Sequence, residues 1–569
     1  MLLRLRIVVF FFTVAAIALL TRLFYWQIIR GGELSLQARA QYLGREQLPA
    51  RRGSILASDG SWLSASVDAW LLYAMIPEIE DARRVANQLA LFLFEEEKEE
   101  GTLMEEAMRI EGQLERDDVV WVPIERKLDG ATKNNIDALG LKGIGFEREE
   151  MRVYPEGSSS AQILGFLGKD EEGRNRGYFG LEGFYDMTLE GSSGYVEREA
   201  NALGVPLLSR RSKRRDALVG VDLVTHVNRS MQLLVEQELK EGIERYGARA
   251  GTAVVMDPKN GGIMAMASFP SYDPAEYVKY GDEYFKNPVI SDSFEPGSVF
   301  KPIVMASALD AGAVEPDSKC DICDGPYKID KYEIKTWDNK YYPDSTMTEV
   351  LMHSDNVGMV FVGNRLGKDK FYDYLEKFGF GEVTGIDLQG EFSPRLRDKG
   401  EWSGVDVATA SFGQGIAVTP IQLVRAISVI ANGGLSMKPQ VVDKLILDDW
   451  EEDIESEKGE RVISEKAAKR IAEMMVMAAK KGEAQWTALT GFEVAGKTGT
   501  AQIPVAGHYD DEKTIASFVG FAPASDPRFV MLVTLREPQS SPWASETAAP
   551  LWFRIAQGIF PILGIQPER

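Results

Sequence analysis

The 569-residue chain contains few of the residues that usually bind metals or activate a serine. Its only cysteines are Cys320 and Cys323, and its only histidines are His226, His353 and His508. One C-x-x-C pair without a second pair of ligands makes a poor zinc site, so we expect neither a metal nor a cofactor. No histidine suggests a Ser-His-Asp arrangement. The cysteine pair predicts a disulfide formed in an oxidising compartment, with two free thiols as the alternative.

The chain also lacks an excess of basic residues. Its net charge of −22 argues against a nucleic-acid partner, because such a protein needs a basic face. The hydrophobic fraction of 44% and the charged fraction of 26% are ordinary for a globular protein. The length leaves room for more than one domain, and there is neither an internal repeat nor a long low-complexity linker.

The one long hydrophobic run lies at the N-terminus. It covers residues 7–20, where Thr13 is the only polar member. About twenty residues suffice to span a bilayer, and Arg4 and Arg6 favour a cytoplasmic start. We therefore expect a transmembrane anchor within residues 1–30, with a cleaved signal peptide as the alternative. In either case the bulk of the chain lies outside the cytoplasm.

Residues 31–217 have the pattern of an extended module of mixed α and β structure. Turn residues 58–60 separate two short apolar segments, which predicts a hairpin. Apolar residues at helical spacing over 85–92 follow two acidic residues that suit a first helical turn. The acidic run 95–100 is interpreted as the solvated end of that helix. The basic run 210–215 predicts an exposed linker or a contact with anionic lipid or polymer.

Residues 218–569 have a tighter pattern. Alternating apolar residues over 223–227 predict a strand, and a four-residue recurrence over 231–243 predicts a helix. Two apolar runs flank Asn260-Gly261, which is a strong hairpin signal. Near the C-terminus, three more strand patterns precede a helix with Pro550 in its first turn. Strands at both ends with helices between them predict an α+β fold, in which one antiparallel sheet is sandwiched by helices.

Three short motifs carry the chemistry. In chain order they are Ser298-Val-Phe-Lys301, Ser354-Asp355-Asn356 and Lys497-Thr498-Gly499. A lone S-x-x-K would occur roughly once or twice by chance in a chain of this length, given ordinary Ser and Lys usage. All three in this order, the first in a helix-starting context and the third in a strand context, are far rarer. Together they outline a serine acyl-transfer site whose base is a lysine.

The first motif places a serine one helical turn before a lysine. Pro302 is tolerated if Ser298 opens a helix, because first-turn amides have no intrahelical partner. The two side chains then share one face, with roughly 5–6 Å between Cβ atoms. A serine needs a base, and Lys301 can serve only when burial or a nearby positive charge keeps it neutral. Lys497 is the candidate for that charge. An N-cap serine and a surface lysine are the alternative.

The second motif offers a hydroxyl and an amide that can point into one cleft. Ser354 is the candidate for passing a proton to the leaving group, and Asn356 for holding the substrate amide. Taken alone, this motif is explained equally well by an ordinary helix cap.

The third motif offers a wall for the substrate. Lys497 and Thr498 are candidates for binding a substrate carboxylate. Gly499 is small enough to let another backbone approach the strand. The amides of Thr500 and Ser298 are candidates for the oxyanion hole.

With these motifs in place, the chain resembles the class B penicillin-binding proteins, and the resemblance runs nearly end to end. These proteins share the motif set with the serine β-lactamases. Further segments that carry the resemblance are Arg51-Arg52-Gly53-Ser54-Ile55, Arg152-Val-Tyr154-Pro155-Glu-Gly157, Leu164-Gly165-Phe166, Gly180-Leu-Glu182-Gly183, Val255-Met-Asp257-Pro258, Phe294-Glu-Pro296-Gly297, and Ser411-Phe-Gly413-Gln-Gly415-Ile-Ala-Val-Thr419-Pro420.

The resemblance implies an anchor over 1–30, a non-catalytic, dimerisation-like α/β pedestal over 31–217 and a transpeptidase domain of the penicillin-binding type over 218–569. It implies a peptidoglycan D,D-transpeptidase in which Ser298 attacks the carbonyl between the last two D-alanines of a stem peptide. D-Alanine leaves, and an amine of a neighbouring stem takes the acyl group. β-Lactams would acylate the same serine.

The resemblance also implies a setting. The protein would cross the cytoplasmic membrane once, with its N-terminus inside and its catalytic domain on the periplasmic or extracellular side. No length remains before the pedestal for a glycosyltransferase domain. A separate polymerase of the SEDS type and other membrane proteins of wall synthesis are therefore the expected partners.

Other functions stay open at this point. A β-lactamase would need a Glu-bearing deacylation loop between the second and third motifs, and none is evident. A non-catalytic β-lactam sensor or scaffold is a second alternative. Within class B, the anchor end at 22–27 and the compact length favour the division-type, FtsI-like branch over the elongation type. The Cys320/Cys323 pair is not a feature associated with the family in general.

Overall fold

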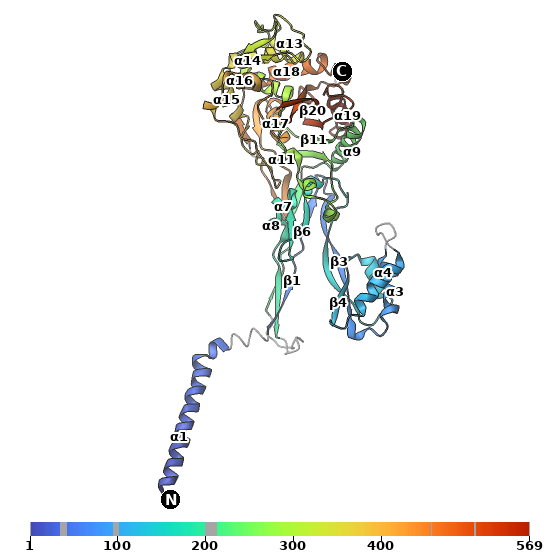
Figure 1. Ribbon diagram of the computed structural model, residues 1–569, viewed down its shortest axis with the longest axis vertical. Helices are drawn as coiled ribbons and strands as arrows, with labels where there is room; N and C mark the ends of the chain where they lie inside the picture. Colours follow the sequence, from blue (N-terminus) through green and yellow to red (C-terminus); the bar gives the residue numbers. More distant parts are fainter. Residues whose placement is uncertain are drawn as a thin grey trace. The chain divides into compact units, whose positions relative to one another are not determined.

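A computed structural model of the chain describes residues 2–34, 43–94, 102–199, 213–456, 458–505 and 508–567. These residues form two compact units, one from 1–52 and 190–220, the other from 53–189 and 221–569 (Figure 1). The acidic run 95–100 and residues 210–212 of the basic run lie outside the described residues.

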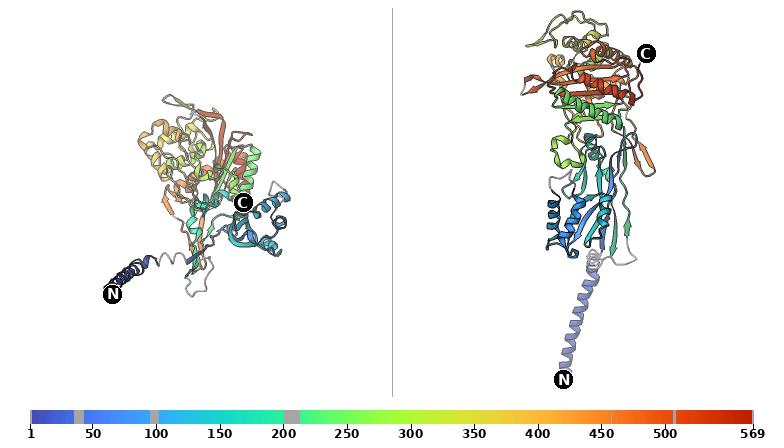
Figure 2. Two further views of the ribbon diagram at one scale, coloured as in Figure 1. Left: turned by 60° about the horizontal axis from the view of Figure 1, so that its bottom comes forward. Right: turned by 90° about the vertical axis from the view of Figure 1, so that its right-hand side faces the viewer.

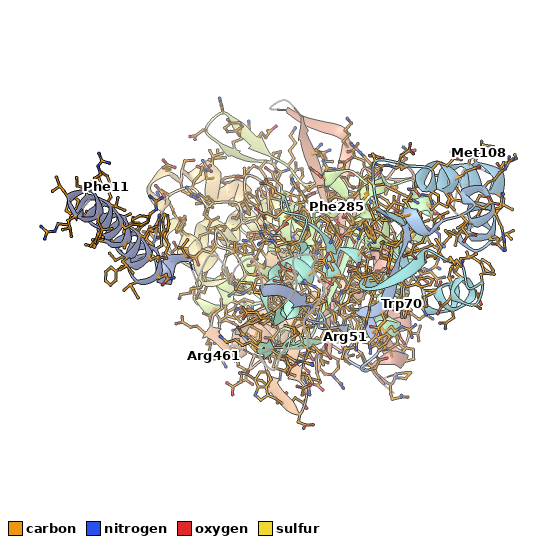
Figure 3. The ribbon with its side chains drawn as sticks, turned by 90° about the horizontal axis from the view of Figure 1, so that it is seen from below. Phe11, Arg51, Trp70, Met108, Phe285 and Arg461 are labelled. Carbon is orange, nitrogen blue, oxygen red and sulfur yellow. A yellow bond between two sulfur atoms is a disulfide. The ribbon has the colours of Figure 1, made fainter. Side chains whose placement is uncertain are left out.

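The first unit contains the predicted N-terminal apolar helix. Helix α1 (Leu2–Phe24) continues as a π-helical turn, η1 (Tyr25–Ile29), and together they are long and apolar enough to cross a membrane, with a mean hydropathy of 2.4. Side chains such as that of Phe11 radiate from it without being buried (Figure 3). The rest of the unit is an antiparallel sheet of β1 (Leu43–Leu48), β8 (Gly194–Glu199) and β9 (Lys213–Arg215).

The second unit begins with a seven-stranded sheet. Its strands, in spatial order, are β17 (Trp450–Asp453), β16 (Val442–Leu447), β10 (Asp222–Thr225), β2 (Ile55–Leu56), β3 (Trp62–Met75) and β4 (Trp121–Leu128), and β5 (Ile144–Val153) also pairs with β3. The predicted hairpin is confirmed: Ala57 and Ser61 close the turn between β2 and β3, and Gly60 adopts a φ of +80° there.

Short helices and a hairpin accompany this sheet. They are η2 (Ile76–Glu78), α3 (Ala82–Leu93), α4 (Leu103–Leu114), α5 (Gly130–Asp137), α6 (Ala161–Leu164), β6 (Phe166–Lys169), β7 (Asn175–Tyr178), α7 (Gly180–Phe184) and α8 (Asp186–Glu190). Helix α3 is the predicted one, and the Asp81 carboxylate caps it by accepting the Arg84 N–H.

A buried ion pair fastens β5 to the elements that follow it. Arg152 Nε donates to Glu182 Oε1 at 2.7 Å, and both side chains are almost wholly buried. Arg152 Nη1 also donates to the Gly53 carbonyl at 2.7 Å, and Ser64 Oγ donates to the same carboxylate. The pair thus joins three segments that lie far apart in the sequence.

The remainder of the unit is built on a five-stranded antiparallel sheet. Its order is β12 (Ile263–Phe269), β11 (Ala250–Met256), β21 (Phe529–Arg536), β20 (His508–Ala522) and β19 (Ala495–Val505). The predicted hairpin around Asn260-Gly261 is confirmed as β11–β12, and the three predicted C-terminal strands are β19, β20 and β21.

Helices cover both faces of this sheet, as predicted. Alternate residues of β11 separate two cores: Ala253 and Val255 pack with α9 (Arg229–Tyr246) and α19 (Ala548–Ile562), whereas Val254 and Met256 pack with helices on the opposite face. In Figures 1 and 2 the sheet lies between these two groups. Strand residues that alternate between two buried faces produce such a sandwich.

Most of the opposite layer comes from the segment between β12 and β19, which also contributes β16 and β17 to the seven-stranded sheet. The helices are η3 (Pro274–Lys279), α10 (Asp282–Phe285), α11 (Pro288–Ser291), η4 (Gly297–Phe300), α12 (Lys301–Asp310), α13 (Met347–Met352), α14 (Asn356–Leu366), α15 (Lys368–Lys377), η5 (Lys399–Glu401), α16 (Gly404–Ala410), α17 (Pro420–Ala431), α18 (Glu465–Lys481) and η6 (Gln485–Thr487). Two small strand pairs are β13 (Tyr327–Ile329) with β14 (Tyr332–Ile334), and β15 (Leu435–Met437) with β18 (Lys458–Arg461).

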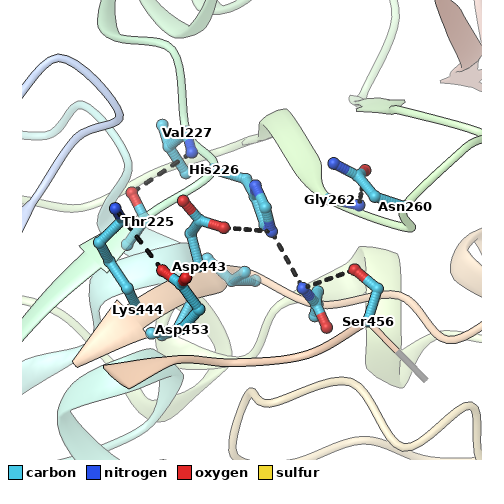
Figure 4. Close-up of polar contacts among 12 residues, drawn as sticks. Thr225, His226, Val227, Asn260, Gly262, Asp443, Lys444, Asp453 and Ser456 are labelled. Atoms are coloured by element: carbon cyan, nitrogen blue, oxygen red, sulfur yellow. Dashed lines mark hydrogen bonds and ion pairs between the residues drawn. The ribbon is translucent and has the colours of Figure 1, made fainter. Parts of the chain in front are cut away.

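A polar cluster around His226 links the two large sheets of this unit (Figure 4). The His226 N–H donates to the Val441 carbonyl, and the ring Nε2 lies 3.0 Å from Gln440 Nε2 and 3.6 Å from Asp443 Oδ1. Gly262 leaves room for the ring, since a Cβ there would lie 2.7 Å from His226 Cγ. Burial lowers the pKa of His226, so near pH 7 the neutral ring can accept the Gln440 amide hydrogen.

The ion pair between Arg152 and Glu182 predicts a large stability effect. Replacing Arg152 by Ala removes the cation paired with the buried Glu182 carboxylate in this contact, which should lower the free energy of unfolding by about 3–5 kcal/mol. Urea denaturation of the detergent-solubilised full chain measures the change. Arg148→Ala is the matched control on the same strand, because Arg148 pairs with Asp68 in the open and should matter by about 1 kcal/mol or less. Equal losses in both variants would contradict this account.

Candidate active site

The fold brings the three motifs to one cavity of about 220 Å³. The first motif lies on η4 and α12, the second between α13 and α14, and the third on β19. The residues that line the cavity are Gly297, Ser298, Trp337, Ser354, Asn356, Phe412, Gln414, Glu483, Gly499, Thr500, Trp543, Ser545 and Glu546.

A tight turn presents Ser298 at the edge of this cavity. Gly297 adopts a φ of +57°, and residues 297–300 form a single 3₁₀ turn before the α-helix begins at Lys301. The sequence predicted an α-helical start at Ser298, which is wrong in detail. Ser298 and Lys301 still share one face, because residues three apart in a 3₁₀ turn lie directly above one another. Pro302 occupies the first turn of α12, as predicted.

Lys301 is completely buried, with an exposed fraction of 0%. Its Nζ contacts three oxygens of the second motif: the Ser354 carbonyl, Ser354 Oγ at 3.2 Å and Asn356 Oδ1 at 2.8 Å. Burial, and then the charge of Lys497, lower the pKa of Lys301 to about 7. The surface lysine considered as an alternative is therefore excluded.

Ser354 lies between the other two reactive groups. Its Oγ donates to Ser298 Oγ at 3.1 Å and accepts from Lys301 Nζ. The residue is buried and has a φ of +57°, in the left-handed region that is unfavourable for side chains other than Gly, Asn and Asp. This conformation aims the hydroxyl at the two partners. In the described contacts, Ser298 reaches the Lys301 amine through this hydroxyl.

The helix cap considered for the second motif is real, but Asp355 provides it. Asp355 Oδ1 accepts the N–H groups of Val357 and Gly358 at the start of α14. This capping leaves Ser354 and Asn356 free to face Lys301. The middle position of the motif, which no sequence pattern singled out, thus fixes its two neighbours.

Strand β19 forms the third wall, and its lysine is also buried. Lys497 is 3% exposed, and its Nζ donates to the Thr498 carbonyl at 3.1 Å and to Thr498 Oγ1 at 3.0 Å. Thr498 Oγ1 donates in turn to Glu483 Oε2 at 2.6 Å. Burial lowers the pKa of Lys497, and the Glu483 carboxylate opposes this shift.

Gly499 and Thr500 complete the wall. A Cβ at Gly499 would lie 2.8 Å from the Val299 N and 3.2 Å from the Pro296 carbonyl oxygen, so the close backbone approach predicted for this glycine is confirmed. Thr500 lines the cavity, and its Oγ1 accepts the Ala544 N–H at 3.0 Å.

Several residues that line the cavity lie outside the three motifs and were not predicted. Trp337 and Trp543 lie with their ring centroids 5.3 Å apart and are 48% and 41% exposed. They come from two connections distant in sequence, and nothing in their local sequence indicates that they meet. Glu483 lies two residues after the end of α18 and outside all three motifs.

The two cysteines form the predicted disulfide. Cys320 and Cys323 are bonded and buried, and the Cys320 N–H donates to the Ser345 carbonyl. The free-thiol alternative is therefore wrong.

Comparisons with known proteins agree with this geometry. Residues 251–557 match the family described as penicillin binding protein transpeptidase domain, and residues 47–225 match the penicillin-binding protein dimerisation domain. Stage V sporulation protein D of Bacillus subtilis is 32% identical, with all of this chain and 86% of the relative aligned. Peptidoglycan D,D-transpeptidase FtsI of Escherichia coli is 30% identical, with 97% of this chain and 90% of the relative aligned.

A solved structure supports the fold. The crystal structure of penicillin binding protein 2X from Streptococcus thermophilus superposes with a TM-score of 0.76 at 22% identity, covering 92% of this chain and 80% of that one. The transpeptidase family alone accounts for more than half of this chain. The chain therefore belongs to the class B penicillin-binding proteins, has their α+β transpeptidase fold and counts FtsI-like proteins among its relatives.

Proposed function

We propose that this protein cross-links peptidoglycan as a D,D-transpeptidase that works through an acyl-enzyme on Ser298. The observation that carries the proposal is the chain of contacts from Ser298 Oγ through Ser354 Oγ to the buried Nζ of Lys301. A buried lysine with a pKa of about 7 is neutral often enough at neutral pH to act as a general base.

Acylation begins when Ser298 loses its proton. Neutral Lys301 takes a proton from Ser354 while Ser354 takes the proton of Ser298, so the serine oxygen can attack the carbonyl between the two terminal D-alanines. The N–H groups of Ser298 and Thr500 stabilise the oxyanion. When the C–N bond breaks, the proton returns through Ser354 to the amine of the departing D-alanine.

Transfer reverses these proton movements. An amine of a neighbouring stem attacks the ester carbonyl, gives its proton to Ser354 and Lys301, and forms a new amide. The C–O bond to Ser298 breaks, and the serine regains its proton from the same pair. A β-lactam follows only the first half, because its leaving amine stays tethered to the acyl group.

The other motif residues hold the donor stem. Lys301 and the Lys335 carbonyl hold the Asn356 side chain in place, and its second amide hydrogen and second oxygen lone pair bind the peptide amide. Lys497, Thr498, Gly499 and Thr500 form the wall that receives the terminal carboxylate.

The proposal extends to the setting of the enzyme. Residues 1–30 anchor the chain in the cytoplasmic membrane with the N-terminus inside, 31–217 form the pedestal, and 218–569 form the transpeptidase domain on the outer side. The relatives include a transpeptidase named FtsI, which supports a role in septal wall synthesis. A SEDS-type glycosyltransferase supplies the glycan strands. The elongation branch is the competing assignment.

Covalent labelling tests the nucleophile. A fluorescent penicillin should form a long-lived adduct with the native protein and none with Ser298→Ala, because Ser298 carries the hydroxyl that lines the cavity and that Ser354 and Lys301 activate. Lys301→Ala should slow labelling by about a hundredfold or more, the usual contribution of a general base. Ser540→Ala, at an exposed serine of the β21–α19 connection, is the control. Rapid loss of the native adduct would indicate a β-lactamase instead.

The pH dependence of labelling tests the base. Lys301 acts only when neutral, so the second-order acylation rate should rise with pH through about 7 and fall about tenfold for each pH unit below. This rate is measured by quenching the labelling reaction at set times, at one ionic strength and at pH values from acid to mildly alkaline. A rate independent of pH on the acid side would rule out Lys301 as the base.

Cellular location tests the division assignment. A fluorescent fusion of the full chain should gather at midcell as cells constrict. Signal spread evenly along the side wall would support the elongation branch.

A further inference from the structure

Glu483 is placed in the cavity by the end of helix α18. The helix stops at Lys481, and Gly482 passes so close to its neighbours that a Cβ there would lie 2.3 Å from the Ala478 carbonyl oxygen and 2.8 Å from that of Met352. The residue that follows therefore has little freedom of position. Its carboxylate lines the same cavity as Ser298 and Thr500.

The Glu483 carboxylate holds the hydroxyl of Thr498. Thr498 Oγ1 gives its only hydrogen to Glu483 Oε2 at 2.6 Å and receives one from Lys497 Nζ at 3.0 Å. A substrate carboxylate would have to take this hydrogen from Glu483. Thr500 differs, because among the described contacts its Oγ1 accepts the Ala544 N–H and donates to no carboxylate.

Four ionisable side chains meet around this point. Two are the buried amines, Lys301 on α12 and Lys497 on β19, and two are carboxylates, Glu483 after α18 and Asp355 at the start of α14. Asp355 caps its helix through Oδ1, burial raises its pKa, and its charge acts on Lys301. Glu483 is the carboxylate that opposes the loss of charge at Lys497, and it also acts on Lys301.

We propose that Glu483 is a positioning residue of the transpeptidase site, whose negative charge keeps Lys497 as the cation of the substrate-binding wall while Lys301 gives up its proton. The proposal rests on the proposed function. Two buried amines close together cannot both stay charged without a counter-ion, and burial alone would discharge either of them. The carboxylate that binds the Thr498 hydroxyl lies on the Lys497 side, so it favours the charged form of that lysine.

This role has a signature that a purely structural residue lacks. Removing a negative charge beside two amines makes each successive proton easier to lose, whichever amine loses it first. Acylation needs Lys301 neutral and Lys497 charged, so its pH profile is bell-shaped. Both limbs of that profile should therefore move to lower pH when Glu483 is made neutral.

The experiment measures acylation by a fluorescent penicillin against pH, using the detergent-solubilised full chain. Glu483→Gln retains the shape and an acceptor for Thr498 but removes the charge, and both limbs should shift down by about half to one pH unit. On the acid side this makes the rate, relative to the variant's own maximum, about 3–10-fold higher than in the native protein. Glu483→Asp keeps the charge and should keep both limbs near their native positions.

Glu546 offers a matched control, since it is a second glutamate that lines the cavity but is exposed to solvent. Glu546→Gln should leave both limbs in place. The proposal is overturned if the limbs of Glu483→Gln do not move, or if they move equally in Glu546→Gln. Should Glu483→Gln fail to fold, Glu483→Ala gives the same readout, and failure of both to fold would make Glu483 structural and refute the proposal.

The controls separate this inference from the proposed function. If the native protein is not labelled, or if Ser298→Ala is labelled as well, the proposed function fails. If the native protein is labelled through Ser298 and the limbs stay fixed in Glu483→Gln, only the role of Glu483 fails.

Discussion

An ammonium group loses several kcal/mol of hydration when it moves from water into a protein interior, and Lys301 is entirely buried. The protein compensates with oxygens from a single short segment, Ser354 and Asn356. The compensation is incomplete, because the charge of Lys497 acts in the opposite direction. The amine is therefore held in a fixed place but is easily discharged, which is the state a general base requires. The other features of the site can be understood as means of holding that segment and that second lysine in position.

The architecture supplies those means through its two cores. Strand β19 is the edge of the five-stranded sheet and runs beside the turn that carries Ser298. Alternate strand residues bury into opposite helical layers, so the sheet cannot slip by one residue without exposing both cores. Helix α14 is capped by Asp355, which fixes the second motif against the same layer. The site is thus located by burial of apolar side chains distant from the chemistry.

Sequence patterns were sufficient for the local elements and for the three motifs. The hairpins at 58–60 and 260–261 follow from turn residues between apolar runs, and the convergence of the motifs follows from the resemblance to a known family. The pairing of β10 with β2 and β16 was not predictable, because those partners lie far away in the chain and short strands carry little register information. Long-range pairing is set by packing of the whole domain and leaves little trace in a local window.

The site residues that escaped prediction share a physical reason. Glu483, Trp337 and Trp543 lie outside regular motifs, and their roles depend on which segment packs opposite them. The 3₁₀ turn at Ser298 escaped for a related reason, since it depends on a glycine conformation that Gly413 and strand β19 impose from outside. Local propensity favours a plain helix start there, and tertiary contact overrides it.

The narrow gap between Gly499 and the turn at Val299 limits how such an enzyme can escape a covalent drug. A side chain at position 499 would press against the backbone of Pro296 and Val299. It would therefore displace the nucleophile along with the inhibitor. Substitutions are better tolerated at Trp337 and Trp543, which line the same cavity and are about half exposed. Resistance in this protein would be expected to evolve at these two tryptophans while the reactive centre stays unchanged.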